Sequence, residues 1–158
     1  MHNVRDLARD RPRLLAVASG GGHWIQLMRM RPAFDGFDVT YVSTLAGYEH
    51  MVDGATVHVV SDSSRFDLRP LVPTMITAWR ILRRARPQAV ITTGSAPALP
   101  FLLLGRLMGC RTLWVDSIAN GERLSTSGRL ARKVATKVLS QWPDVADAEG
   151  VECWGRVV

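Results

Sequence analysis

Short apolar runs alternate along the chain with longer segments in which apolar residues recur at helical spacing. The runs predict strands at 14–18, 38–43, 57–60, 89–93 and 112–115, and short final strands at 138–140 and 153–158. Helices are predicted just after the first run and at 70–86, 97–108 and about 128–137. Strands that alternate with helices of about 10–15 residues indicate βαβ units around a parallel sheet. We therefore predict an α/β, Rossmann-like fold with helices on both faces of the sheet.

The chain is long enough for one core and too short for two ordinary domains, because it has 158 residues. We predict a polar leader at 1–12 and a single domain at 13–158. The leader is charged throughout and has no apolar core, so it does not look like a secretory signal. No run approaches the ~20 apolar residues that span a bilayer. Two cysteines are too few for a disulfide framework, which favours a cytoplasmic protein.

A glycine-rich loop at 19–23 follows the first predicted strand and precedes a helix. Gly20, Gly21 and Gly22 allow the backbone to approach a ligand, and the helix N-terminus offers N–H groups to an anion. Neither the G-x-G-x-x-G fingerprint nor a Walker A loop is present. His23 favours a ligand site, because its side chain is expected at the C-terminal edge of the sheet. The alternative is a tight strand-to-helix turn without a ligand.

Two further polar loops are predicted at the same edge. Gly94 and Ser95 follow the fourth predicted strand, but the G-x-S-x-G elbow of hydrolases is absent. Asp116, Ser117 and Asn120 follow the fifth. Because the carboxyl ends of parallel strands meet at one edge, these loops predict a small-molecule site in a single crevice. The sequence shows no cluster of His and carboxylate residues that would predict a metal site. It implies no cofactor.

The predicted helix at 70–86 combines an apolar side with a basic one. Trp79 lies among Arg80, Arg83 and Arg84, and the whole chain has a net charge of +6. One interpretation is an ordinary helix packed on the sheet with a solvated basic face. The other is attachment to an anionic membrane surface. Nucleic-acid binding is not favoured, because no helix-turn-helix, zinc finger or RNP-type strand accompanies the arginines.

A series of motifs runs in order over almost the whole chain. They are Gly21-Gly22-His23, Thr93-Gly94-Ser95-Ala96-Pro97, Val115-Asp116-Ser117-Ile118-Ala119, Leu124-Ser125-Thr126-Ser127-Gly128 and Gln141-Trp142-Pro143. In these motifs the chain resembles the acceptor-side subunit of the two-component N-acetylglucosaminyltransferase of asparagine-linked glycosylation. The resemblance is greater still to the bacterial relatives of that subunit that act in capsule and exopolysaccharide synthesis.

The resemblance implies the N-terminal half of a GT-B glycosyltransferase, in which two Rossmann-like domains face each other. This half would hold a lipid-linked acceptor, and a separate donor-binding chain would complete the active site. The implied reaction transfers a sugar from a UDP-sugar to a polyprenyl-diphosphate-linked saccharide. The protein would then lie at the inner face of the cell membrane as a peripheral subunit, inactive without its partner.

The resemblance also assigns roles to residues at the predicted crevice. His23 is the candidate base or orienting residue, since an imidazole titrates near neutrality. The candidates for contact with the acceptor and its phosphates are Gly20, Gly21, Gly22, Gly94, Ser95, Asp116, Ser117 and Asn120.

Two other functions compete with the transferase subunit. A scaffold that recruits a catalytic glycosyltransferase to the membrane would tolerate the loss of His23. A nucleotide-binding regulatory domain would bind UDP or NAD on its own, whereas the transferase subunit is expected to bind little donor without its partner.

Overall fold

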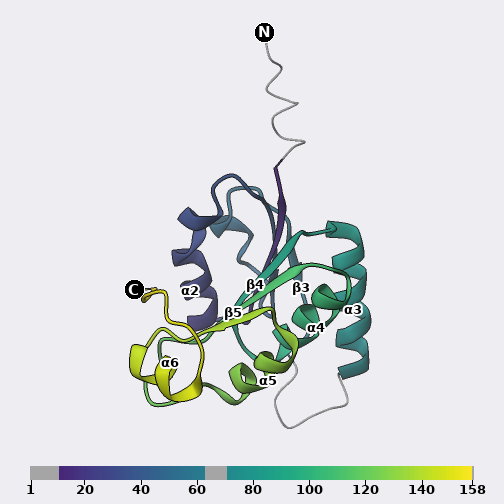
Figure 1. Ribbon diagram of the computed structural model, residues 1–158. Helices are drawn as coiled ribbons and strands as arrows, with labels where there is room; N and C mark the ends of the chain where they lie inside the picture. Colours follow the sequence, from purple (N-terminus) through teal and green to yellow (C-terminus); the bar gives the residue numbers. More distant parts are fainter. Residues whose placement is uncertain (1–10, 63–70, 158) are drawn as a thin grey trace.

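A six-stranded parallel sheet forms the centre of the computed structural model, which describes residues 11–62 and 71–157 (Figure 1). The strand order is β3-β2-β1-β4-β5-β6. The strands are β1 (Arg13–Ala18), β2 (Asp38–Ser43), β3 (Val57–Val59), β4 (Ala89–Gly94), β5 (Arg111–Val115) and β6 (Lys137–Leu139). The order reverses between β1 and β4, which is the topological switch point where open α/β sheets bind ligands. The predicted α/β, Rossmann-like class is confirmed.

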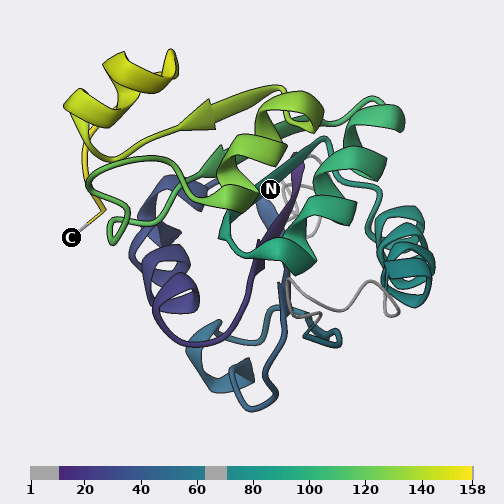
Figure 2. The same ribbon diagram turned by 90° about the horizontal axis from the view of Figure 1, so that it is seen from below.

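Helices cover the two faces of the sheet unequally. The α-helices are α2 (Gly22–Arg29), α3 (Leu71–Ala85), α4 (Leu99–Leu107), α5 (Thr126–Val134) and α6 (Pro143–Glu149). Short 3₁₀ turns are η1 (Arg31–Phe34), η2 (Glu49–Met51) and η3 (Ala96–Ala98). Helix α2 lies on one side of the sheet, and α3, α4 and α5 lie on the other (Figures 1 and 2). None of the helices in the described ranges is long and apolar enough to cross a membrane.

The central strand β1 is buried on both sides, because its run of apolar residues has no polar interruption. Leu15 and Val17 belong to the core beneath α3, α4 and α5. Leu14, Ala16 and Ala18 belong to the core on the α2 side. Continuous burial of this kind is typical of strands in parallel sheets that are covered on both faces.

Two sequence expectations near the C-terminus are wrong. Helix α5 spans Thr126–Val134 instead of about 128–137. It begins at Thr126 because the Ser125 hydroxyl caps it by accepting from the Gly128 amide at 2.8 Å. The predicted strand at 153–158 does not form in 153–157, and only Glu152 makes an isolated bridge to Leu139. Instead the preceding segment forms α6, which the sequence pattern missed because it has few apolar residues. Residues 1–10, 63–70 and 158 lie outside the described part.

The buried β1 run predicts a large difference between two leucine substitutions. Leu15→Ala empties a fully buried position in the central strand and should cost about 2–5 kcal/mol of unfolding free energy. The control Leu107→Ala removes a side chain that is 74% exposed on α4 and should cost less than about 0.5 kcal/mol. Urea denaturation measures both values, and similar losses for the two variants would contradict the central position of β1.

Candidate functional site

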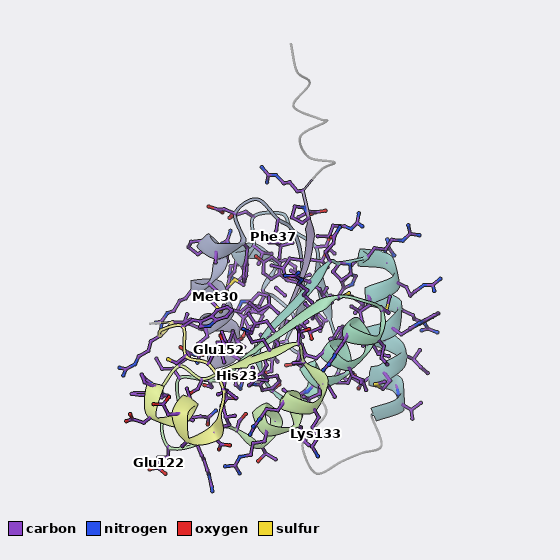
Figure 3. All side chains as sticks on the ribbon, in the orientation of Figure 1. His23, Met30, Phe37, Glu122, Lys133 and Glu152 are labelled. Atoms are coloured by element: carbon purple, nitrogen blue, oxygen red, sulfur yellow. The ribbon has the colours of Figure 1, made fainter. Side chains whose placement is uncertain are left out.

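His23 lies in the first turn of α2, where its ring contacts the end of β4 (Figure 3). The ring nitrogen Nδ1 lies 2.9 Å from the carbonyl oxygen of Thr93. A carbonyl oxygen can only accept, so Nδ1 carries the proton and donates it to this bond. The Thr93 hydroxyl in turn donates to the His23 carbonyl oxygen at 2.6 Å. In the neutral form of the ring, this bond leaves the lone pair on Nε2, as a general base requires.

Gly94 makes room for the His23 ring. Its φ is +127°, and a Cβ at this position would lie 2.8 Å from both Cε1 and Nδ1 of His23. No real Cβ approaches a neighbour so closely, so glycine is required for the observed ring position. The expected proximity of Gly94 to His23 at the sheet edge is thus present in the structure.

Ser95 adopts an unusual backbone conformation directly after Gly94. Its φ is 85°, in a region that residues other than glycine rarely occupy. Its hydroxyl oxygen is buried and has no hydrogen-bond partner among the described residues. Strained backbone and an unsatisfied buried hydroxyl both occur preferentially at functional sites.

The glycine-rich loop is held by polar side chains from the segment after β2. The Gly20 amide donates to the Thr44 hydroxyl at 3.1 Å, and the Gly21 amide donates to the Tyr48 hydroxyl at 3.0 Å. Both amides are therefore paired within the chain, and their predicted contact with phosphate stays a prediction. Gly22 opens α2, where N–H groups of the first turn have no intrahelical partner.

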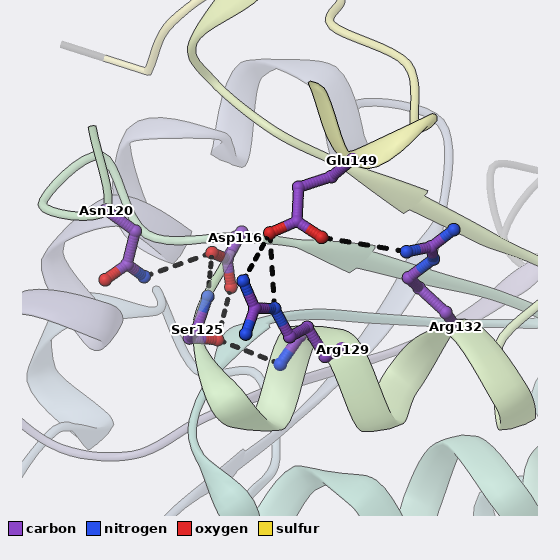
Figure 4. A network of polar contacts seen from close by, with 7 residues as sticks. Asp116, Asn120, Ser125, Arg129, Arg132 and Glu149 are labelled. Atoms are coloured by element: carbon purple, nitrogen blue, oxygen red, sulfur yellow. Dashed lines mark hydrogen bonds and ion pairs between the residues drawn. The ribbon is translucent and has the colours of Figure 1, made fainter. Parts of the chain in front are cut away.

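Asp116 organises the loop after β5 (Figure 4). Its carboxylate is buried and accepts four hydrogen bonds. The donors are the Trp114 indole, the Asn120 amide group, and the backbone amide and hydroxyl of Ser125, at 2.6–3.1 Å. Because these bonds are all internal, Asp116 orders the loop, and its predicted contact with the acceptor stays a prediction. The side-chain carbonyl of Asn120 has no partner within the described ranges.

Ion pairs at the surface join α5 to α6 beside this loop (Figure 4). The Glu149 carboxylate accepts from Arg129 at 2.7 Å and lies 3.7 Å from Arg132. The hydrogen bond from Arg129 lowers the pKa of the Glu149 carboxyl. A lowered folded-state pKa stabilises the fold at neutral pH, and this small contribution is lost as the pH falls through that pKa.

A second polar cluster, which was not predicted from the sequence, joins the site to the end of β6. Gln26 lies on the same side of α2 as His23, one turn along, and is buried. Its side-chain amide bonds with Ser117 and Gln141. The signal in the sequence was a lone amide among the apolar residues of α2, together with the Gln-Trp-Pro motif.

A separate cavity of about 690 Å³ lies on the α2 side of the sheet. Its lining is mostly apolar and includes Met30, Phe34, Phe37, Leu113 and Leu139, and it does not include His23. The cavity extends over β4, β5 and β6, beyond the part of the sheet that α2 covers.

The predicted membrane surface lies on α3, away from the site loops. Trp79 is 48% exposed, and the Arg83 guanidinium lies 5.3 Å from the centre of its ring. Arg80 and Arg84 are exposed as well. Val72 and Ile76, also exposed, extend the apolar stripe along the helix.

Known proteins with similar sequences are subunits of a sugar transferase. No protein-family model matches the chain. The UDP-N-acetylglucosamine transferase subunit ALG14 of Eremothecium gossypii is 33% identical over 91 residues, which cover 50% of this chain and 41% of that protein. ALG14 of Yarrowia lipolytica is 22% identical over 86% of this chain and 76% of that protein. The chain thus spans less than half the length of the first of these relatives.

The fold is also that of a known glycosyltransferase structure. The crystal structure of Acinetobacter baumannii MurG superimposes with a TM-score of 0.69 and 17% identity, over 85% of this chain and 43% of that one. This likeness shows the Rossmann-like fold found in GT-B enzymes. The sequence matches are to proteins named as UDP-N-acetylglucosamine transferase subunits.

The contact between Gly94 and His23 predicts the effect of adding one methyl group. Gly94→Ala should displace the His23 ring and destabilise the fold by about 1–3 kcal/mol, because the new Cβ overlaps the imidazole at an unfavourable φ. The control Gly22→Ala should have little effect, since a Cβ there meets nothing within 4 Å. Thermal denaturation measures the stability of each variant, and the NMR signals of the His23 imidazole report the position of the ring. Unchanged His23 signals in Gly94→Ala would contradict this geometry.

Proposed function

We propose that this chain is the acceptor-binding subunit of a heteromeric glycosyltransferase. It would transfer a sugar from a UDP-sugar to a polyprenyl-diphosphate-linked saccharide, in the synthesis of a cell-surface polysaccharide or a lipid-linked oligosaccharide. The observation that carries this proposal is the orientation of the His23 imidazole by the Thr93 carbonyl at the switch point of the sheet. The similarity to the ALG14 subunits, which are named for UDP-N-acetylglucosamine transfer, supports a UDP-sugar as the donor.

In the proposed mechanism, Nε2 of His23 takes the proton of the acceptor hydroxyl. The hydroxyl oxygen then bonds to the anomeric carbon of the sugar, and the bond from that carbon to the diphosphate breaks. UDP leaves with the electron pair of the broken bond. The Thr93 carbonyl, which accepts from Nδ1, stabilises the imidazolium that forms. Ser95 and Asn120 are the proposed contacts to the acceptor, because each has polar groups not used inside the described chain.

A donor-binding GT-B half on a separate chain is the proposed partner. The match covers 43% of the MurG chain, and we propose that a donor domain corresponding to the remainder lies on the partner. The apolar cavity over β4, β5 and β6 supports a partner, because parallel sheets are normally covered on both faces. Apolar surface of this kind is typical of protein contacts.

We place the proposed subunit at the inner face of the cell membrane as a peripheral protein. The exposed side of α3 supports this location, because Val72, Ile76 and Trp79 lie beside Arg80 and Arg83. Apolar side chains insert into the lipid interface, and arginines attract anionic headgroups.

Replacement of His23 tests the proposed function. The chain with its donor-binding partner, UDP-N-acetylglucosamine and a polyprenyl-diphosphate-linked acceptor should show turnover, and the chain alone should show none. His23→Ala should then lower kcat by about 10²–10⁴-fold while the pair still assembles. His50→Ala, which removes an exposed histidine at η2, is the control and should leave kcat unchanged. Turnover by the chain alone, or activity of His23→Ala within a few-fold, would refute the proposal.

Two exposed tryptophans test the membrane surface. Trp79→Ala should weaken binding to vesicles of phosphatidylglycerol and phosphatidylcholine several-fold, and added salt should weaken the wild type as well. Trp154→Ala removes an even more exposed ring, at 63%, outside α3 and should have no effect. Vesicle co-sedimentation measures both. Equal binding by the two variants would argue against α3 as the membrane surface.

A further inference from the structure

A buried pair of amide side chains links α2 to the segment after β6. Gln26 and Gln141 are 6% and 1% exposed. The amide nitrogen of Gln141 donates to the amide oxygen of Gln26 at 2.9 Å. Buried amides are costly unless they are paired, so each of their hydrogen bonds constrains how the two side chains are oriented.

Backbone partners determine the orientation of Gln141. Its amide oxygen accepts from the Val157 backbone N–H at 2.7 Å, and its nitrogen donates to the Asp116 carbonyl oxygen at 2.9 Å. A backbone N–H can only donate and a carbonyl can only accept, so the opposite orientation of this amide would break both bonds. The remaining hydrogen of the Gln141 nitrogen is the one donated to Gln26.

The orientation of Gln141 in turn determines that of Gln26. The Gln26 oxygen accepts from Gln141 and, at 3.4 Å, from the Ile118 backbone N–H. Its nitrogen therefore faces Ser117 and donates to the Ser117 hydroxyl oxygen at 3.1 Å. The backbone groups of Val157 and Asp116 thus determine, through Gln141 and Gln26, that the Ser117 hydroxyl oxygen accepts this bond.

The Ser117 hydroxyl is consequently left as a hydrogen-bond donor. A hydroxyl has one hydrogen and two lone pairs. Both lone pairs are used, because the oxygen also accepts from the Ala119 backbone N–H at 3.3 Å. Within 11–62 and 71–157, no acceptor is bonded to the Ser117 hydrogen, which has to point away from both nitrogens.

We propose that Gln26 and Gln141 are positioning residues that hold the Ser117 hydroxyl as a donor to an oxygen atom of the acceptor molecule. That oxygen belongs to the diphosphate or to the saccharide. The inference rests on the proposed acceptor-binding function and adds a specificity rule to it. A ligand with an oxygen at this point gains a hydrogen bond, whereas a ligand with an N–H there meets a second donor and is rejected.

Ser117 variants test the donor directly in the full chain. Inorganic pyrophosphate and N-acetylglucosamine serve as probes for the two sources of the oxygen, and titration by NMR gives their affinities. Ser117→Ala should lower the affinity for one of the probes at least about tenfold if the oxygen is charged, and less if it is neutral. Ser117→Thr keeps the hydroxyl and should restore most of the affinity. The affected probe identifies the ligand oxygen.

A double-mutant cycle tests the role of the amide pair. Gln26→Met keeps the side-chain length but removes the donor to Ser117, so it should weaken the same probe. In a Ser117→Ala background it should cause no further loss, because it acts through Ser117. A purely structural role would weaken binding equally in both backgrounds. Gln88→Met, at an exposed glutamine before β4, is the control and should change nothing.

The outcomes separate this inference from the function on which it rests. If the wild-type chain binds neither probe, both the proposed acceptor-binding function and this inference are overturned. Binding by the wild type that persists in Ser117→Ala would overturn the inference alone. If Gln26→Met lowers the affinity for the probe equally in the wild-type and Ser117→Ala backgrounds, the positioning role of Gln26 is overturned.

Discussion

The buried carboxylate of Asp116 is the interaction on which the site edge of this protein depends. Four internal donors from Trp114, Asn120 and Ser125 satisfy it, and without them a buried carboxylate would be strongly destabilising. The same serine caps α5, so one network orders both the loop after β5 and the start of that helix. Gly128 permits the close approach, because a Cβ there would lie 2.7 Å from the carboxylate.

The two faces of the sheet are covered unequally, which supports the proposal of a partner chain. Helices α3, α4 and α5 bury one face, while α2 covers only part of the other and leaves an apolar cavity over β4, β5 and β6. His23 lies at the C-terminal edge, where the loops after β1, β4 and β5 meet. This position is consistent with the proposal that the chain presents an acceptor to a donor site on a partner chain.

Local patterns predicted most of the fold, because apolar runs and helical spacing report burial directly. The β1 to β5 strands and the polar loops after them follow from such patterns. Expectations failed where the determining contact is distant or weakly patterned. No strand forms at 153–157, where only the preceding Glu152 makes an isolated bridge, and α6 carries too few apolar residues to be recognised. The bonds from the Gly20 and Gly21 amides to side chains of the segment after β2 were likewise not predicted.

The sequence by itself determined the α/β class, the order of the elements and the set of polar residues at one sheet edge. Only the tertiary structure decided what each polar group does, because hydrogen bonds join residues far apart in the chain. Thr93 sets the tautomer of His23 across 70 positions, and Gln141 orients Gln26 across 115. Spacing in a sequence cannot reveal such pairs, since each depends on the direction of a donor and an acceptor brought together by folding.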